Sequence, residues 1–161
     1  MLTLTPDQFT KKLNQHSLAI KTLIERDLPI IIGKQAVDHF KLNFDNQGWH
    51  RKKWKEVQRR EGTWERGGKL VFNKKKGSDR YRDILIGRTA NLKRSIQYTP
   101  ENGKVTIHSD LIYAAVHNFG LHAGRGSGFT MPQRQFIGDD PELINHITKI
   151  INTKLNAILS S

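Results

Sequence analysis

The sequence predicts an α+β fold: a small antiparallel sheet with N-terminal helices and a C-terminal amphipathic helix packed on it. Two observations predict it. Apolar residues recur at helical spacing near both ends of the chain, and an Asn-Gly pair at 102–103 separates two alternating runs. The chain has 161 residues, enough for one hydrophobic core. We therefore expect a single domain over residues 1–161.

The N-terminal part of the chain predicts two helices. Thr5 is placed to cap the first and Pro6 suits its first position, so we expect a helix from residue 6 to about 26. Pro29 is expected to interrupt it, and a second helix is expected over 29–43, ended by turn-forming residues. In the first helix Phe9, Leu13, Ile20 and Ile24 fall near helical spacing. The candidate buried positions of the second helix are Ile32, Ala36, Phe40 and Leu42.

A basic segment, residues 49–94, follows these helices. It holds 16 of the 27 Lys and Arg residues but only 5 of the 15 Asp and Glu, so it carries nearly all of the net charge of +12. We expect it to be loop-rich, with a strand at 69–72 and an exposed loop at 73–80. Such a block suits nucleic acid or an acidic protein surface; a solvated face kept for solubility is the alternative. The side chains expected to face DNA or a partner are Lys74, Lys75, Lys76, Arg80 and Arg82.

Three tryptophans, Trp49, Trp54 and Trp64, lie among these cations. Aromatic side chains stack on the bases of single-stranded nucleic acid. Their irregular spacing is equally typical of residues that anchor a loop-rich segment to a core, and both interpretations remain open.

The residues after the basic loop predict a helical turn and a hairpin. Thr89 is placed to cap a short turn that carries Leu92. The Asn102-Gly103 pair predicts a hairpin with a type I′ turn. His108 is expected to point away from the apolar face of its strand, toward solvent or a neighbour. The residues expected to share a face within their strands are Ile96 with Tyr98 and Val105 with Ile107.

The C-terminal third predicts two more helices joined by irregular chain. A short helix is expected over 110–119, capped by Asp110 and ended by Gly120. A flexible glycine loop follows at 120–128, and Pro132 favours an extended segment at 129–138. Asp140 and Pro141 mark the start of the last helix, whose apolar stripe is Leu143, Ile147, Ile150, Ile151, Leu155, Ile158 and Leu159.

Known catalytic patterns are missing from the sequence. His108, His117 and His122 lie close together with Asp110, but their spacing does not place two ligands on one helical face. The glycines at 124–128 lack the strand, helix and Lys-Ser/Thr of a phosphate loop. There is no cysteine and no Gly-x-Ser-x-Gly. We expect no catalytic residue, no metal and no cofactor. No apolar run approaches the roughly 18 residues that a membrane span needs, and the N-terminus lacks the pattern of a signal peptide.

Three short motifs, in this order, carry a family resemblance: "ILIGRTANLKRSI", "IYAAVHNFG" and "MPQRQFIG". With the hairpin, the glycine loop and the final amphipathic helix, this order resembles the phage virion morphogenesis (tail completion) proteins of tailed phages and prophages. One position departs, because Ala90 stands where the family usually has glycine. The matching positions are Trp49; Thr89, Leu92, Ser95 and Ile96; Tyr113, Ala114, His117, Phe119 and Gly120; Met131, Pro132, Arg134, Phe136 and Gly138.

The resemblance implies a non-enzymatic structural protein that completes the tail or joins tail to head. It implies a homo-oligomeric ring in the virion neck around the DNA channel, with other neck, tail or connector proteins as partners. DNA in the lumen is a further expected partner, a membrane is not, and the protein is expected in the host cytoplasm during assembly. The alternatives are a free basic DNA-binding protein and a histidine-dependent nuclease.

The resemblance also marks residues for interaction. The interaction candidates are Tyr113, His117, Phe119, Gly120, Pro132, Arg134 and Phe136. Tyr113, Ala114 and Phe119 are expected to bury the short helix, and His117 to hydrogen-bond to a neighbouring segment or subunit. Arg134 suits either a bidentate pair with a carboxylate of the next subunit or bonds within its own chain.

Overall fold

The computed structural model describes residues 5–57, 60, 63–66, 69–72 and 81–161, with backbone alone for 63–66 and 69–72. The chain forms two compact units. Unit 1 contains residues 1–38, 97–108 and 140–161, and unit 2 contains residues 39–96 and 109–139. The α+β class is confirmed, with the strands of the described chain arranged as four two-stranded antiparallel sheets. The single domain over 1–161 stays a prediction.

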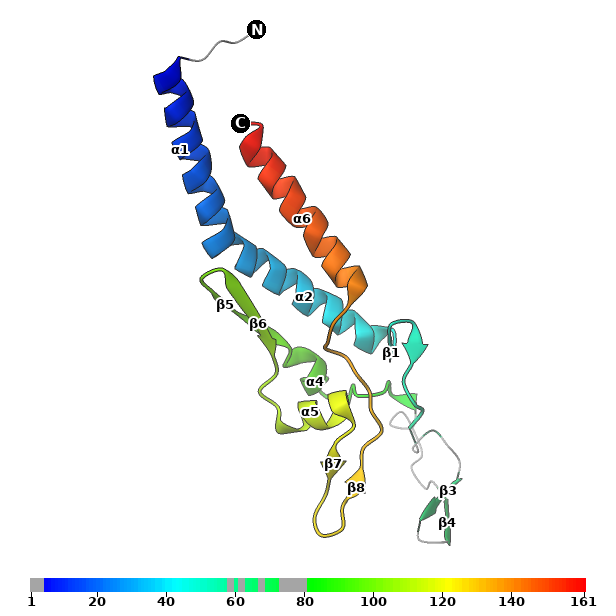
Figure 1. Ribbon diagram of the computed structural model, residues 1–161. Coiled ribbons are helices and arrows are strands. Elements are labelled where there is room, and N and C mark those ends of the chain that lie inside the picture. Colours follow the sequence, from blue (N-terminus) through cyan, green and yellow to red (C-terminus); the bar gives the residue numbers. More distant parts are fainter. Residues whose placement is uncertain (1–4, 58–59, 61–62, 67–68, 73–80) are drawn as a thin grey trace. The chain divides into compact units, whose positions relative to one another are not determined.

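Unit 1 begins with helix α1, Pro6–Thr22 (Figure 1). Its N-terminus is the one expected: Thr5 Oγ1 accepts from the Gln8 N–H (3.3 Å), and Gln8 Oε1 accepts from the Thr5 N–H (3.0 Å). This reciprocal capping box satisfies two backbone donors that a helix end otherwise leaves without partners.

The expected break at Pro29 is wrong, because the helical run continues through it. A π-helical turn, η1 (Leu23–Asp27), joins α1 to α2 (Leu28–Asp45), and the Leu28 N–H bonds to Leu23 O. Proline has no N–H to offer the carbonyl four residues earlier. That carbonyl belongs to Glu25, and it accepts instead from the Gly103 N–H (3.2 Å). The hairpin turn thus supplies the hydrogen bond that Pro29 cannot make.

The hairpin of unit 1 pairs β5 (Gln97–Glu101) with β6 (Lys104–His108). Its two-residue loop is confirmed, but the turn is not of type I′, which needs positive φ at both central residues. Gly103 alone takes positive φ (67°). On the outer face His108 Nε2 and Thr99 Oγ1 lie 3.0 Å apart, so His108 meets a neighbour as expected.

Tyr98 fixes the hairpin against α2. A Cβ added at the buried Gly33 would collide with the Tyr98 ring, so the ring lies directly on the helix backbone. Only glycine allows this approach.

Helix α6 (Pro141–Leu159) completes unit 1 and runs beside α1 (Figure 1). Asp140 caps it as expected: Oδ1 accepts from the Glu142 (2.8 Å) and Leu143 (3.3 Å) N–H groups. Leu143 is buried, but most of its expected apolar stripe is only half-buried and Leu159 is exposed.

The apolar residues at helical spacing in α1 and η1 are mostly exposed. Phe9, Leu13 and Ile24 are exposed. The side of α1 near the end of α6 carries Gln8, Gln15 and Ala19, which follow one another at about two turns and one turn on a different face. The apolar stripe of α1 therefore has no cover within the described chain.

Unit 2 contains the end of α2 and a series of short elements. These are β1 (Gly48–Trp49) with β2 (Lys52–Lys53), β3 (Thr63–Arg66) with β4 (Lys69–Phe72), α4 (Asn91–Arg94), α5 (Ile112–Phe119), and β7 (His122–Ala123) with β8 (Phe129–Thr130). The strand expected at 69–72 is confirmed. Within 120–128, however, His122–Ala123 is a strand, so the glycine loop is partly a hairpin.

The core of unit 2 is built on the last turns of α2. Phe40 and Phe44 are buried, whereas Leu42, which was expected to be buried, is 53% exposed. Residues 40 and 44 lie one turn apart on one helical face and residue 42 lies on the other. The remaining buried apolar residues are Trp54, Ile84, Leu92, Ile96, Ala114 and Phe136.

Replacing Gly33 with alanine tests the contact between the hairpin and α2. Alanine improves helix propensity, so an exposed site would gain stability. Here we expect Gly33→Ala to lower the free energy of unfolding by about 1–3 kcal/mol, because the methyl group displaces the Tyr98 ring. Denaturant unfolding measures the change. The exposed neighbour variant Lys34→Ala is the control and should stay near wild type; a gain in Gly33→Ala would contradict the contact.

Candidate functional site

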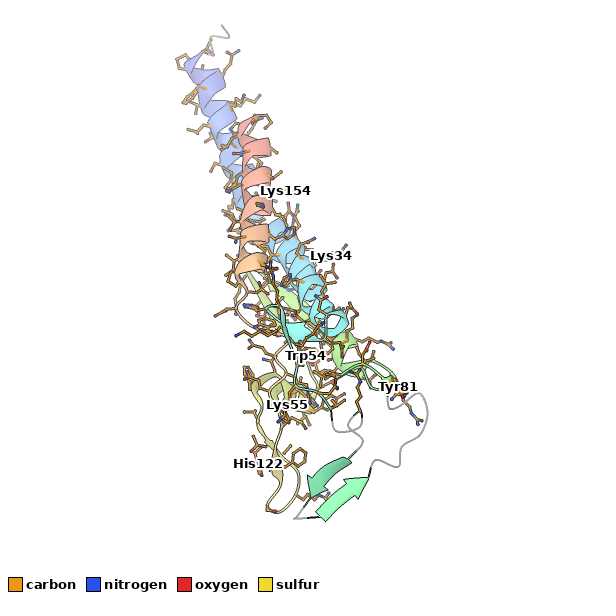
Figure 2. The ribbon with its side chains drawn as sticks, turned by 90° about the vertical axis from the view of Figure 1, so that its right-hand side faces the viewer. Lys34, Trp54, Lys55, Tyr81, His122 and Lys154 are labelled. Atoms are coloured by element: carbon orange, nitrogen blue, oxygen red, sulfur yellow. The ribbon has the colours of Figure 1, made fainter. Side chains whose placement is uncertain are left out.

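An aromatic cluster supports the candidate site of unit 2. The ring centroid of Phe44 lies 5.5 Å from that of Trp54 and 5.1 Å from that of Phe136. The Trp54 indole N–H donates to Gln135 O (2.8 Å), and the side chain is buried. Trp54 is labelled in Figure 2. Trp49 stacks on Phe40 at 6.1 Å. Trp54 and Trp49 therefore anchor the basic segment to a core, while the Trp64 side chain lies outside the described residues.

Asn118 joins α5 to the segment after β8. Its Oδ1 accepts from the backbone N–H groups of Phe136 (2.9 Å) and Ile137 (3.0 Å), and its Nδ2 donates to Ile137 O (3.0 Å). Asn43 Nδ2 adds a bond to Phe136 O (3.2 Å). Both asparagines are buried, and each satisfies backbone groups that would otherwise be costly to bury.

The sequence reasoning missed these two asparagines. The available signal was the position of Asn118, four residues after Ala114 on the inward face of a short apolar helix. A polar side chain on such a face is buried only where it has hydrogen-bond partners.

Arg134 is buried and bonded within its own chain. Its Nε and Nη2 donate to Lys55 O (3.1 and 3.0 Å), and Nη2 also donates to Glu56 O (3.3 Å). Its exposed fraction is 6%. This is the intramolecular one of the two arrangements considered from the sequence. The charged donors hold the chain that follows Trp54 against the chain that precedes Phe136.

The three motifs meet at one cavity of about 350 Å³ within unit 2. The segment 84–92 supplies most of its wall, α5 supplies Tyr113 and His117, and the segment after β8 supplies Arg134. The wall is apolar at Ile84, Leu85 and Leu92 and polar at Thr89 and Asn91. The cavity can therefore take an apolar group together with one or two hydrogen bonds.

His117 is the half-buried titratable group of this cavity. Burial, and after it the nearby Arg134 cation, lower the pKa of His117 below the ordinary value of 6.5, so the neutral imidazole is favoured. Its ring meets Tyr113 edge-on with centroids 6.2 Å apart. The hydrogen bond expected of its side chain is not made at Nδ1, which is buried without a partner among the described residues. The pinning bond comes from its backbone, because His117 O accepts from the Arg134 N–H (2.8 Å).

The first motif turns at Ala90, not at Thr89. Ala90 is the N-cap of α4 in left-handed conformation (φ 51°), with no side-chain cap, so the expected Thr89 cap is wrong. Left-handed backbone is unfavourable for alanine and open to glycine. The glycine that the resembling family usually carries at this position therefore has a structural reason. Leu92 is buried as expected.

Helix α5 has one buried face and one exposed apolar face. Ala114 is buried, but Tyr113 and Phe119 are 42% and 62% exposed, so their expected burial is wrong. The inward positions belong to Ala114 and Asn118, one turn apart, and Ile112 and Phe119 lie on the other side of the helix, with Ile112 93% exposed.

The prediction for the N-terminus of α5 is wrong, and the prediction for its C-terminus is confirmed. The expected Asp110 cap is wrong, because the helix begins at Ile112 with Leu111 as N-cap and no side-chain cap. Ser109 Oγ instead accepts from the Leu111 N–H (3.4 Å). Gly120 ends the helix in left-handed conformation (φ 67°), as expected, and lies against the backbone of Gln133.

The structure describes only one of the five Lys and Arg residues that were expected to face DNA or a partner. Lys74, Lys75, Lys76 and Arg80, with the loop expected at 73–80, lie outside the described residues. Arg82 is half-buried, and its carbonyl oxygen accepts from Arg60 Nη2 (2.9 Å). In the described part of the chain, no three His, Cys, Asp or Glu residues are grouped to hold a metal ion. Nor is any described helix long and apolar enough to cross a membrane.

The class of protein follows from a comparison of the sequence with protein-family models. Residues 34–156, which make up most of the chain, match the model of the phage virion morphogenesis family. The protein therefore belongs to this family and has a structural or assembly role in the phage virion. Searches of curated proteins and of solved structures found no significant match. Helix α1 and the start of α2 lie outside the matched residues.

Restoring glycine at position 90 should stabilise the protein. We expect Ala90→Gly to raise the free energy of unfolding by about 1 kcal/mol, because glycine adopts the left-handed conformation without the Cβ penalty. Denaturant unfolding measures it. Ala115→Gly, at an exposed position inside α5, is the matched control and should lose about 1 kcal/mol. Equal losses in both variants would show that position 90 is not left-handed.

The lowered pKa of His117 makes stability depend on pH. Below the unfolded-state pKa the unfolded chain binds more protons than the folded protein, so the folded state is favoured at higher pH. The contribution of His117 is present above about pH 6.5 and is lost as the pH falls toward the lower folded-state pKa. We expect the wild type to lose more unfolding free energy than His117→Gln between pH 7.5 and 5.5. Equal losses would contradict a neutral buried imidazole.

Proposed function

We propose that the protein acts in tail completion or head–tail joining, as a ring-forming component of the virion neck. Family membership supports the virion role, and the exposed apolar face of α5 is the observation that carries the subunit contact. Ile112 is 93% exposed and Phe119 is 62% exposed, so one side of α5 leaves apolar surface in water. Each Å² of this apolar surface that another subunit covers would contribute about 25 cal/mol to the contact.

A ring needs two different surfaces on each subunit, because a head-to-tail contact repeats around an axis. Unit 2 offers two: the exposed face of α5 and the mouth of the motif cavity. The proposed partners are other copies of the chain and the neighbouring neck, tail or connector proteins. The proposed location is the neck or tail of the virion, with the host cytoplasm as the place of assembly.

The proposed role involves no catalysis. Arg134 fits a structural role, because its guanidinium donates to the backbone carbonyls of its own chain. A free basic DNA-binding protein is the second candidate, favoured by the surplus of cations in residues 49–94.

Particles made without the protein test the proposed role. In the phage or prophage that encodes it, we expect deletion of the gene to give filled heads and tails that stay unjoined, seen by negative-stain electron microscopy. The double variant Ile112→Ser/Phe119→Ser should reproduce much of this defect, because it removes the apolar face while α5 keeps its buried side.

Ile144→Ser on α6 is the matched control, since Ile144 is also exposed (57%) and lies in the other unit. It should assemble normally. Infectious particles of normal appearance after deletion would refute the assembly role, and normal assembly of the α5 double variant would refute the contact face.

A further inference from the structure

The hairpin formed by β1 and β2 presents a cluster of cations. Gly48 pairs with Lys53 and Trp49 with Lys52, so His50 and Arg51 form the two-residue turn. His50, Arg51, Lys52 and Lys53 are exposed, and so is Lys55 two residues further on. No acidic residue occurs between positions 46 and 55.

The turn has an unusual composition for its geometry. His50 and Arg51 take φ values of 47° and 65°, the pattern of a type I′ turn. Such turns favour Asn-Gly, because left-handed backbone is unfavourable for residues with larger side chains. Backbone held in an unfavourable conformation is concentrated at functional sites. Here it places two cationic or polar side chains at the tip, where Asn-Gly would be more stable.

The hairpin is fixed at its base. Trp54 is buried, its backbone N–H donates to Gln47 O (2.9 Å), and its indole donates to Gln135 O (2.8 Å). The Trp49 ring is stacked with Phe40 (centroids 6.1 Å apart) and with His50 (4.6 Å). The cations therefore extend from a rigid base, which lowers the entropy lost when they bind.

The cations point in more than one direction. Successive side chains of a strand point to opposite faces, and Lys52 and Lys53 are both exposed, so both faces of β2 carry positive charge, although Lys53 Nζ also donates to Asn46 O. We propose that this hairpin binds the phosphate backbone of duplex DNA by entering a groove. The major groove admits a two-stranded ribbon and has phosphates along both walls.

An acidic protein surface fits this arrangement less well. A protein patch would meet one face of the hairpin and leave the cations of the other face in water. A groove places negative charge on both sides of the inserted ribbon. Binding should be independent of sequence, because Lys and Arg contacts to phosphates carry no base information. The inference does not require the ring proposed above.

Salt-dependent binding tests the inference on the full-length protein. Anisotropy of a labelled 20-base-pair duplex of arbitrary sequence is measured from about 50 to 200 mM salt. The test variant is Arg51→Gln/Lys52→Gln/Lys55→Gln, which spares Lys53 because its Nζ donates to Asn46 O (2.6 Å). Loss of three phosphate contacts should lower the slope of log K against log salt by about 2.7 and weaken binding at least about tenfold at low salt.

The matched control removes three exposed lysines from α1: Lys11→Gln/Lys12→Gln/Lys21→Gln. It has the same net charge as the test variant and should keep the slope of the wild type. Equal losses in both variants would mean that net charge alone attracts DNA, and the inference would fail. Absence of wild-type binding at 50 mM salt would also overturn it, as would binding to poly-glutamate in place of duplex DNA.

A second variant separates loss of DNA binding from loss of folding. His50→Asn/Arg51→Gly installs the favoured type I′ residues, so its thermal midpoint should rise while its salt slope falls by about 1. A raised midpoint with an unchanged slope would show that the tip does not touch DNA. Normal head–tail joining by variants that no longer bind DNA would leave the proposed assembly role standing, so the two proposals fail separately.

Discussion

The side-chain amide of Asn118 is the interaction on which unit 2 depends. It satisfies two backbone N–H groups and one carbonyl of residues 136 and 137, which makes it act like a neighbouring strand. This bonding seats Phe136 between the aromatic core and α5. It also sets the position of Arg134, two residues earlier, whose guanidinium then reaches the carbonyls of Lys55 and Glu56. One buried asparagine thus aligns two of the three family motifs with the basic segment.

The same arrangement packs two of the family motifs, at His117 and Arg134, against each other. Arg134 uses its charge on backbone carbonyls, and its field together with burial favours neutral His117. The backbone carbonyl of His117 accepts from the Arg134 N–H, so backbone as well as side-chain hydrogen bonds join the helix to the extended segment. The residues that point outward on α5 are apolar, which directs the helix toward contact with other proteins.

Local signals in the sequence were sufficient for much of the fold. The Thr5 and Asp140 caps, the end of α5 at Gly120 and the hairpin around residue 102 follow from short-range chemistry. Long-range contacts explain the failures. The helix passes Pro29 because Gly103, distant in sequence, bonds to Glu25 O. The burial of Asn118 and the exposure of Phe119 depend on which face of α5 meets residue 136, and periodicity alone does not give that face.

Amide hydrogen exchange at Phe136 and Ile137 tests the central role of Asn118 most directly. In the wild type both amides should be strongly protected, because each donates to a buried side-chain oxygen. In Asn118→Ala both should exchange at least about tenfold faster, relative to amides within α6, since each loses its acceptor. Asn145→Ala, at an exposed position of α6, should leave them unchanged. Protection of both amides at the wild-type level in Asn118→Ala would contradict the account.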